Sequence, residues 1–446
     1  MDDADTDIAA AVGRTWTDDR PWEFLTDLTA IGSRMAASPG EERASELVAD
    51  AFDEAGLRDV HREPFETNEW RRGSADLDLL APVERSFETI ALPYCPPGDV
   101  RGELVDVGYG TPEEVDDADV EGKIAVASTT TPEGGRFVHR MEKFGYAAEA
   151  GAVGFVFVNH VPGQLPPTGS LTFDREATIP AVGVSKETGA WLTEYADRGD
   201  SEARLRVDAE TVTGESRNVL ARVGPDSDRE VFALAHYDAH DIAEGALDNG
   251  CGVATLVTAA RILAETEDDL DIGVRFAAVG CEETGLAGAE RLAATTETND
   301  VKCVLNLDGA GRFRDLVALT HTSEATEEVV RRVGEAANQP VRVKSEPHPF
   351  SDQWPFVRAG VPALQLHSDS GERGRGWGHT HADTRDKVDD RNVREHGILA
   401  AFALREMADR ATEMPTLDAY EVEEAFREAD YETGMRAAGL WPTAWE

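Results

Sequence analysis

The sequence predicts an α/β fold: a mixed, largely parallel sheet flanked by helices, with a second, β-rich domain inserted into it. Strand-like apolar runs alternate with helical runs between residues 216 and 411, a pattern typical of such sheets. Short β-like pieces separated by Gly and Pro turns occupy residues 67–212. The chain has 446 residues, which exceeds one average domain. We therefore assign residues 1–66 and 213–446 to a main domain and residues 67–212 to the inserted domain.

The N-terminal part of the main domain is predicted to be helical. Residues 21–31 have a helical pattern, and Ser38 followed by Pro39 is typical of an N-cap and a first helical position. Apolar residues then recur at helical spacing up to Gly56. We expect an extended segment over residues 57–66.

The inserted domain is predicted from β-like pieces at residues 75–80, 102–107, 122–127, 152–158 and 180–184. Helical patterns cover residues 141–150 and 186–195. This segment has no cluster of His, Asp and Glu at metal-ligand spacing, so the chemistry is expected in the main domain.

From residue 216 onwards, strands and helices alternate. The predicted strands are residues 218–223, 231–235, 272–279, 301–307, 316–319, 341–343 and 361–366. The predicted helices are residues 253–265, 287–295, 324–337, 354–359 and 393–411. In an open α/β sheet, the carboxyl ends of the strands converge on one crevice, where ligands bind.

The charge of the chain limits its partners and its environment. The formal net charge is -44, from 87 acidic and 43 basic residues. Nucleic-acid binding is not expected, because neutralising phosphates requires clustered Lys and Arg. Such self-repulsion is best tolerated where salt is concentrated, since the Debye length falls to about 3 Å at 1 M salt. We therefore interpret the source as a halophile.

Nothing in the sequence predicts a membrane or secretory segment. No apolar run reaches about 18 residues, and the acidic N-terminus lacks the basic and apolar regions of a signal peptide. We expect a cytoplasmic protein with no membrane partner. The four cysteines form no CxxC pair, so they are interpreted as small buried residues in a reducing compartment.

Ionisable side chains follow four of the predicted strands. Placing so many there would be costly unless they formed a site. These residues are His236, Asp238, Asp248, Glu282, Glu283, Asp308, His379, His381 and Asp383. Imidazoles and carboxylates suit two zinc ions, although Co²⁺ or Mn²⁺ would fit the same ligands.

Two metal ions about 3.5–4 Å apart need a bridging carboxylate and a water between them. We interpret Asp248 as that bridge. Of the neighbouring pair Glu282 and Glu283, one is expected to bind metal and the other to exchange a proton. We assign Glu283 as the ligand and Glu282 as the general base.

The motifs, in their order, resemble those of the co-catalytic zinc exopeptidase family. This family includes bacterial leucyl aminopeptidases, glutamate carboxypeptidase II and carboxypeptidase Q. The matching stretches are His236-Tyr237-Asp238, Gly245 to Asn249, Glu282 to Leu286, Asp308 and Gly378 to Thr384. The resemblance implies the zinc aminopeptidase fold, an inserted protease-associated domain and hydrolysis of peptide bonds by a water bridging two zinc ions.

By this resemblance, one zinc ion takes His236, Asp248 and Asp308, and the other takes Asp248, Glu283 and His379. The spacing alone does not choose between His379 and His381, because residues two apart on a strand face the same side. The family pattern favours His379 and leaves His381 near the substrate. Asp238 is interpreted as a catalytic residue that orients His236 through its ring N–H.

Some residues of the loop and of the later motif have weaker assignments. His240 and Asp241 are interpreted as loop structure or indirect supports rather than ligands. Relatives often carry Ser-Asp-His where this chain has Ser351-Asp352-Gln353. That departure leaves Asp352 a candidate substrate contact only.

The resulting hypothesis is an aminopeptidase or dipeptidase that acts on free peptides. Two alternatives stay open: a metal-free, non-catalytic binding or receptor protein on the same fold, and a single-zinc acyltransferase of the glutaminyl cyclase type. The sequence does not determine side-chain or chain-end specificity, the native metal, the role of the inserted domain, or whether the chain forms a homodimer.

Overall fold

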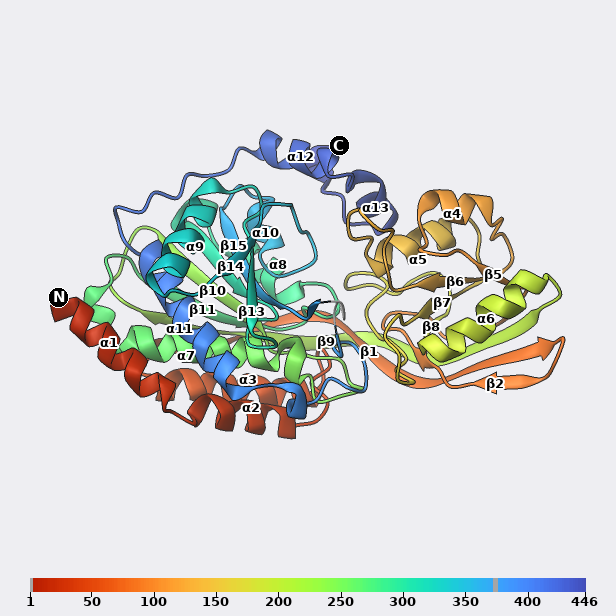
Figure 1. Cartoon of the computed structure of the whole chain (residues 1–446), viewed down its shortest axis with the longest axis horizontal. Helices are drawn as coiled ribbons and strands as arrows, with labels where there is room; N and C mark the ends of the chain where they lie inside the picture. The colour runs from red at the N-terminus through yellow and green to blue at the C-terminus, as the bar shows by residue number, and fades with distance from the viewer. Residues whose placement is uncertain (1–2, 372–375) are drawn as a thin grey trace. The chain divides into compact units, whose positions relative to one another are not determined.

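The computed structural model describes residues 3–371 and 376–446, which divide into two compact units (Figure 1). Unit 1 comprises Met1–Thr67, Glu215–Gly378 and Asp383–Ala425, and unit 2 comprises Asn68–Gly214, His379–Ala382 and Phe426–Glu446. From the sequence, residues 426–446 are expected in the main domain, whereas the structure groups them with unit 2. Residues 379–382 are also grouped with unit 2.

The larger sheet follows the order β14-β13-β15-β12-β10-β11-β9-β1-β2, with β4 on β9. Strand β10 pairs in parallel with β11 and β12, and β12 in parallel with β15. Strands β9 and β13 each add an antiparallel pairing. The central strands are β10 (Glu230–His236), β11 (Val274–Val279), β12 (Val301–Leu307), β13 (Asp315–Leu319), β14 (Val341–Lys344) and β15 (Ala363–Asp369). The predicted mixed, largely parallel sheet is confirmed.

Helices cover this sheet on both faces. Helices α7 and α11 pack on each other and, with α1, α2, α3 and α9, share one continuous apolar core (Figure 1). Side chains on β10 alternate: Val231 and Ala233 join that core, whereas Phe232 packs against Phe356 of α10 on the other face. The helices are α1 (Asp3–Trp16), α2 (Arg20–Ala30), α3 (Pro39–Glu54), α7 (Cys251–Glu265), α8 (Ala287–Thr295), α9 (Glu324–Ala336), α10 (Trp354–Val357), α11 (Asp390–Met407) and α12 (Ala419–Glu428).

The start of α3 follows directly from its sequence. The Ser38 side chain accepts a hydrogen bond from the Glu41 backbone N–H, and Pro39 occupies the first helical position. After α3, Gly56 adopts a φ of +88°, a conformation that glycine reaches without a Cβ clash. The chain then enters β1 (Arg58–Ala81), whose counterpart after the insert is β9 (Glu202–Val223).

Unit 2 contains a smaller sheet in the order β3-β8-β7-β6-β5. Its strands are short, and β6 and β7 are largely buried. The elements inserted between β1 and β9 are β2 (Arg85–Phe87), β3 (Ile90–Ala91), β4 (Gly98–Gly102), β5 (Leu104–Asp106), β6 (Ile124–Ser128), β7 (Gly154–Val158), β8 (Ala181–Val184), α4 (Pro112–Asp117), α5 (Arg140–Glu149) and α6 (Lys186–Arg198).

The C-terminal segment belongs to unit 2 because it packs there. Helix α13 (Glu432–Ala437) lies against α5, and a Cβ at Gly145 of α5 would lie 2.4 Å from the Ala437 carbonyl oxygen. Arg136 also donates a hydrogen bond to the Asp430 carbonyl. Nearby, Trp441 and Trp445 stack edge to face. The sequence shows these aromatic residues but not the surface that receives them.

Two further observations concern expectations from composition. Across the described ranges, no helix has both the length and the apolar character of a membrane span. All four cysteines are free and buried, as predicted.

Candidate metal centre

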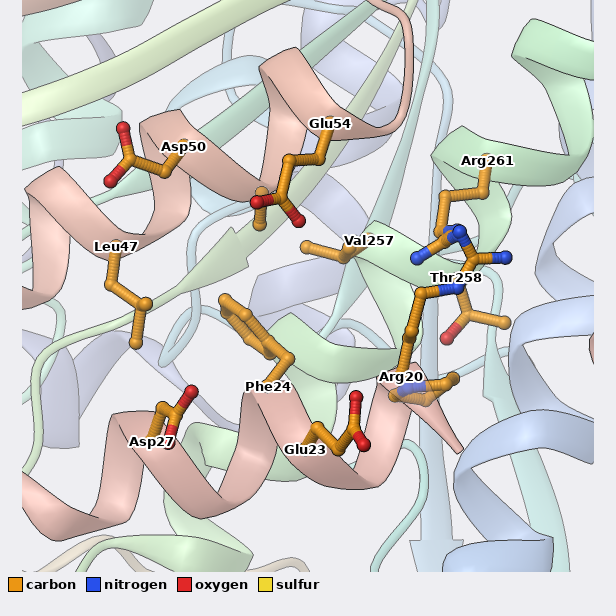
Figure 2. Close-up of a pocket in the computed structure, with 12 residues that line it drawn as sticks. Arg20, Glu23, Phe24, Asp27, Leu47, Asp50, Glu54, Val257, Thr258 and Arg261 are labelled. Carbon is orange, nitrogen blue, oxygen red and sulfur yellow. The ribbon is translucent and has the colours of Figure 1, made fainter. Parts of the chain in front are cut away.

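The pocket in Figure 2 is not where the predicted site residues lie. It lies between α2, α3 and α7, with Phe24 and Leu47 on its apolar side and Arg20 and Arg261 at one end. Its lining includes none of the residues that follow the central strands. Those residues gather instead at the carboxyl ends of β10, β11 and β12.

Three of them form what we call the first cluster: His236, Asp248 and Asp308. His236 ends β10, Asp248 lies in the turn Ala246–Gly250, and Asp308 follows β12. His236 Nε2 lies 3.5 Å from Asp248 Oδ1 and 3.8 Å from Asp308 Oδ1. One ligand atom from each residue lies within 4.8 Å of the others. This spacing allows one metal ion to be held by all three.

The donors of the first cluster fit a metal ion. His236 Nε2 is buried and makes no hydrogen bond to any residue that the structure describes, an arrangement that is costly unless another partner is bound. The opposite ring nitrogen, Nδ1, lies 3.4 Å from Asp238 Oδ1, which turns Nε2 toward the two aspartates. One imidazole and two carboxylates are a ligand set suited to zinc.

The second cluster consists of His240 and Glu283. His240 Nε2 lies 3.0 Å from Glu283 Oε2, and both side chains are buried. From the sequence, Glu283 is predicted to bind metal and His240 to be loop structure. The structure brings the two together.

Glu282 lies beside the first cluster. Its Oε2 is 3.9 Å from His236 Nε2, and 12% of its side chain is exposed. Burial raises the pKa of Glu282 well above its usual range against the opposing charge of His236, and Asp308 and Glu283 raise it further. A partly accessible carboxyl with a high proton affinity is suited to accept a proton.

Two buried aspartates hold the backbone of the loops that carry the carboxylates. Asp238 accepts hydrogen bonds from the backbone N–H groups of Glu282 and Glu283, at 3.0 and 3.1 Å. Asp383 accepts from those of Leu247 and Asp248, at 2.6 and 3.1 Å. Asp238 therefore positions the Glu-Glu turn in addition to His236. Asp383 plays the matching role for Asp248.

A third buried carboxylate supports the same turn. Glu41 of α3 accepts a hydrogen bond from the Cys281 backbone N–H at 3.1 Å and from that of Ala37 at 2.7 Å. Burial, reinforced by the charge of Asp238, raises the pKa of Glu41 to about 8. Burial and the charge of Asp248 raise that of Asp383 to about 7. These supports titrate near neutral pH.

Two arginines support the site, and no sequence pattern points to either of them. Arg34, fully buried, donates hydrogen bonds to the carbonyl oxygens of Tyr237, Glu244 and Gly245. Arg312 Nη2 lies 2.7 Å from Asp248 Oδ1 and 3.2 Å from Asp308 Oδ1. Arg34 thus holds the loop that begins with His236, and Arg312 balances the charge of the first cluster.

The segment Ser351-Asp352-Gln353 also reaches the site. Ser351 Oγ donates to Asp308 Oδ2 at 2.8 Å, and Gln353 Oε1 accepts from the Asn306 side chain at 2.8 Å. Gln353 therefore braces β12. Asp352 is fully buried, and neither of its oxygens hydrogen-bonds to a described residue. Burial raises its pKa well above the usual range.

His379 and His381 lie in the segment that groups with unit 2. His379 is buried, has a φ of +59°, and its carbonyl oxygen accepts a hydrogen bond from the Thr168 N–H at 2.8 Å. His381 is exposed. Their assignment to the metal centre stays a prediction.

Two regions of the chain match models of known protein families. Residues 218–404 match the model of peptidase family M28, and residues 100–192 match that of the PA domain. Over residues 218–404 the chain is therefore similar to peptidase family M28. It is a peptide-bond hydrolase with a PA domain inserted before the peptidase region, which confirms the family and the enzyme class predicted from the motifs.

Several proteins similar to this peptide-bond hydrolase match it over most of its length. It is 27% identical to the aminopeptidase YwaD of Bacillus subtilis, over 87% of this chain and 84% of that protein. Carboxypeptidase Q of Bos taurus is 23% identical over 89% and 87% of the two chains. Among solved structures, the aminopeptidase from Aneurinibacillus sp. strain AM-1 is 25% identical with a TM-score of 0.68, over 92% of this chain and 97% of that one.

Proposed function

We propose that this peptide-bond hydrolase is an exopeptidase, an aminopeptidase or dipeptidase, that acts on free peptides with two zinc ions. In the proposal, His236, Asp248 and Asp308 hold one ion. Asp248, Glu283 and His379 hold the other. A similar solved structure, 25% identical, is described as a zinc aminopeptidase from Bacillus subtilis, which supports zinc as the metal.

Within this proposal, the metal ions supply Lewis acidity that polarises the scissile carbonyl and lowers the pKa of the attacking water. Glu282 accepts a proton from that water and delivers it to the leaving amine. Asp238 keeps Glu282 and Glu283 in place through their backbone N–H groups. The reaction yields a free amino acid and a shorter peptide, or two amino acids from a dipeptide, and Glu282 supplies the proton that the leaving amine needs.

One observation carries the proposal: Glu282 Oε2 lies 3.9 Å from His236 Nε2, beside a cluster whose three donors fit one metal ion. A proton acceptor next to a metal-binding cluster is the arrangement that metal-assisted hydrolysis needs. The intact donor set disfavours a metal-free binding protein. The family match and the similar aminopeptidases do not favour a glutaminyl cyclase-type acyltransferase.

The test is hydrolysis of paired dipeptides, with free and with blocked α-amines, in multimolar KCl. The protein is assayed as purified, after chelation, and after zinc is returned. We expect cleavage of the unblocked peptides only, loss of cleavage with the chelator, and recovery with zinc. Cleavage of N-blocked peptides would shift the assignment to a carboxypeptidase. Chelator-resistant cleavage would refute the metal-dependent mechanism.

A further inference from the structure

His240 is the side chain that the family motifs leave without a role, yet it lies against a predicted metal ligand. Its Nε2 is 3.0 Å from Glu283 Oε2. Both side chains are buried: 5% of His240 and 3% of Glu283 remain exposed. An imidazole nitrogen this close to a ligand carboxylate lies within the range of a metal ion that the carboxylate binds.

The loop holds His240 in a fixed position. The backbone N–H of Ala239, the preceding residue, donates to the Arg34 carbonyl oxygen at 3.0 Å. The guanidinium of Arg34 binds the carbonyls of Tyr237 and Gly245 on either side, at 3.0 and 2.9 Å. Arg34 therefore fixes the chain before and after His240. The backbone on both sides of His240 is thus held independently of the contact between its imidazole and Glu283.

The same loop connects the two clusters. His236 enters the first cluster, and His240, four residues later, enters the second. Between them, Asp238 accepts hydrogen bonds from the backbone of Glu282 and Glu283. Loop and Glu-Glu turn are thus joined by two contacts, Asp238 to the backbone and His240 to the Glu283 side chain. Both ends of the His240–Glu283 pair are pre-positioned, as a metal site requires.

We propose that His240 is a ligand of the second metal ion, in addition to Glu283. This inference rests on the proposed two-metal function. A neutral imidazole adds a donor without adding negative charge. It favours zinc, cobalt or copper over magnesium, calcium or manganese, which prefer oxygen ligands.

Two substitutions separate ligation from simple pairing. His240→Gln keeps a side chain that hydrogen-bonds to Glu283 but is a poor zinc ligand. His240→Cys supplies a thiolate, which binds zinc. The matched control is His321→Gln, which changes another buried histidine of unit 1 that belongs to neither cluster. Circular dichroism and thermal unfolding in the same salt verify that each variant is folded.

The measurement is zinc bound per chain at buffered free zinc concentrations, together with the visible spectrum of the Co²⁺-loaded protein. We expect wild type, His321→Gln and His240→Cys to bind two ions. His240→Gln should lose more than about 100-fold in affinity for one ion, which is the most that loss of an indirect support typically costs, and show a weaker or shifted Co²⁺ spectrum. His240→Cys should show a new sulfur-to-cobalt absorption band.

The outcomes separate the two proposals. If wild type binds two ions and His240→Gln binds both with unchanged affinity and spectrum, His240 is not a ligand, while the two-metal function stands. If wild type binds one ion or none under saturating zinc, the two-metal function fails and the inference fails with it.

Discussion

The two clusters are supported alike but charged differently. Beneath each, a buried aspartate accepts hydrogen bonds from two consecutive backbone N–H groups: Asp383 at the first cluster and Asp238 at the second. At the first cluster, Arg312 Nη2 lies 2.7 Å from Asp248 Oδ1. The second pairs Glu283 with His240. The two clusters thus share the same kind of backbone support, whereas the side chain next to their carboxylates differs.

The largest effect is expected at Glu282, which lies beside the first cluster but is assigned to neither. Glu282→Gln should lower kcat by about 10³-fold because it removes the proton acceptor. Bound zinc should stay unchanged. Steady-state kinetics with metal analysis on the same sample checks both. Wild-type turnover in a metal-loaded variant would remove Glu282 from the mechanism.

The next effect concerns the residue that the two metals are proposed to share. Asp248→Asn should lower the affinity for both ions, each by about 100-fold. Asp308→Asn should lower the affinity for only one of them. Titration of metal-free protein with zinc, followed by calorimetry, distinguishes the two variants. Loss of a single ion in both variants would mean that Asp248 does not bridge.

Replacing Arg312 should affect only the first cluster. It should lower the stability of the metal-free protein but raise the affinity of this cluster for zinc. In metal-free protein, Arg312→Leu leaves two buried carboxylates without their cation and should destabilise the fold by about 3 kcal/mol. Zinc affinity at the first cluster should rise about tenfold, because a positive charge near the ion is removed. Chemical unfolding and chelator competition measure the two effects. Weaker zinc binding in the variant would indicate that Arg312 chiefly orients the aspartates.

The smallest effect is a pH dependence of stability that differs between the buried carboxylates supporting the two clusters. The pKa of Glu41, below the second cluster, is raised from 4.5 to about 8. Ionising this carboxyl is therefore harder in the folded state, and its contribution to stability falls as pH rises from about 5 to about 8. In metal-free protein, the Tm of Glu41→Gln relative to wild type should rise over this interval.

The corresponding residue below the first cluster is Asp383, whose pKa is raised from 3.8 to about 7. Its contribution should fall between about pH 4 and pH 7, so the Tm of Asp383→Asn relative to wild type should level off at a lower pH than that of Glu41→Gln. Tm differences that do not vary with pH in either variant would contradict the origin of both shifts in burial.

The sequence predicted the sheet and the residues at its strand ends because both depend on local patterns. Apolar runs mark β10 and β12, and His236 and Asp308 follow at their ends. The residues that support the site could not be predicted in this way, because their contacts are distant in sequence. Arg34, for example, donates to the Tyr237 carbonyl, 203 positions away along the chain. Nothing near Arg34 or Glu41 in the sequence indicates such partners.

The position of His240 could not be predicted from the sequence for a different reason. Its loop holds several ionisable residues within a few positions, and spacing does not tell which of them turns inward. The backbone next to His240 is held by a hydrogen bond from the Ala239 N–H to the Arg34 carbonyl oxygen, a contact that only the folded chain contains. Similarly, the grouping of residues 426–446 with unit 2 depends on a receiving surface at α5 far away in the sequence.

The central claim is that the two clusters hold two metal ions in one site. The most direct test is a crystal structure of the zinc-loaded protein with anomalous scattering measured above and below the zinc absorption edge. We expect two zinc peaks: one among His236, Asp248 and Asp308, and one against Glu283 and His240. A single peak, or a second peak remote from Glu283, would contradict it.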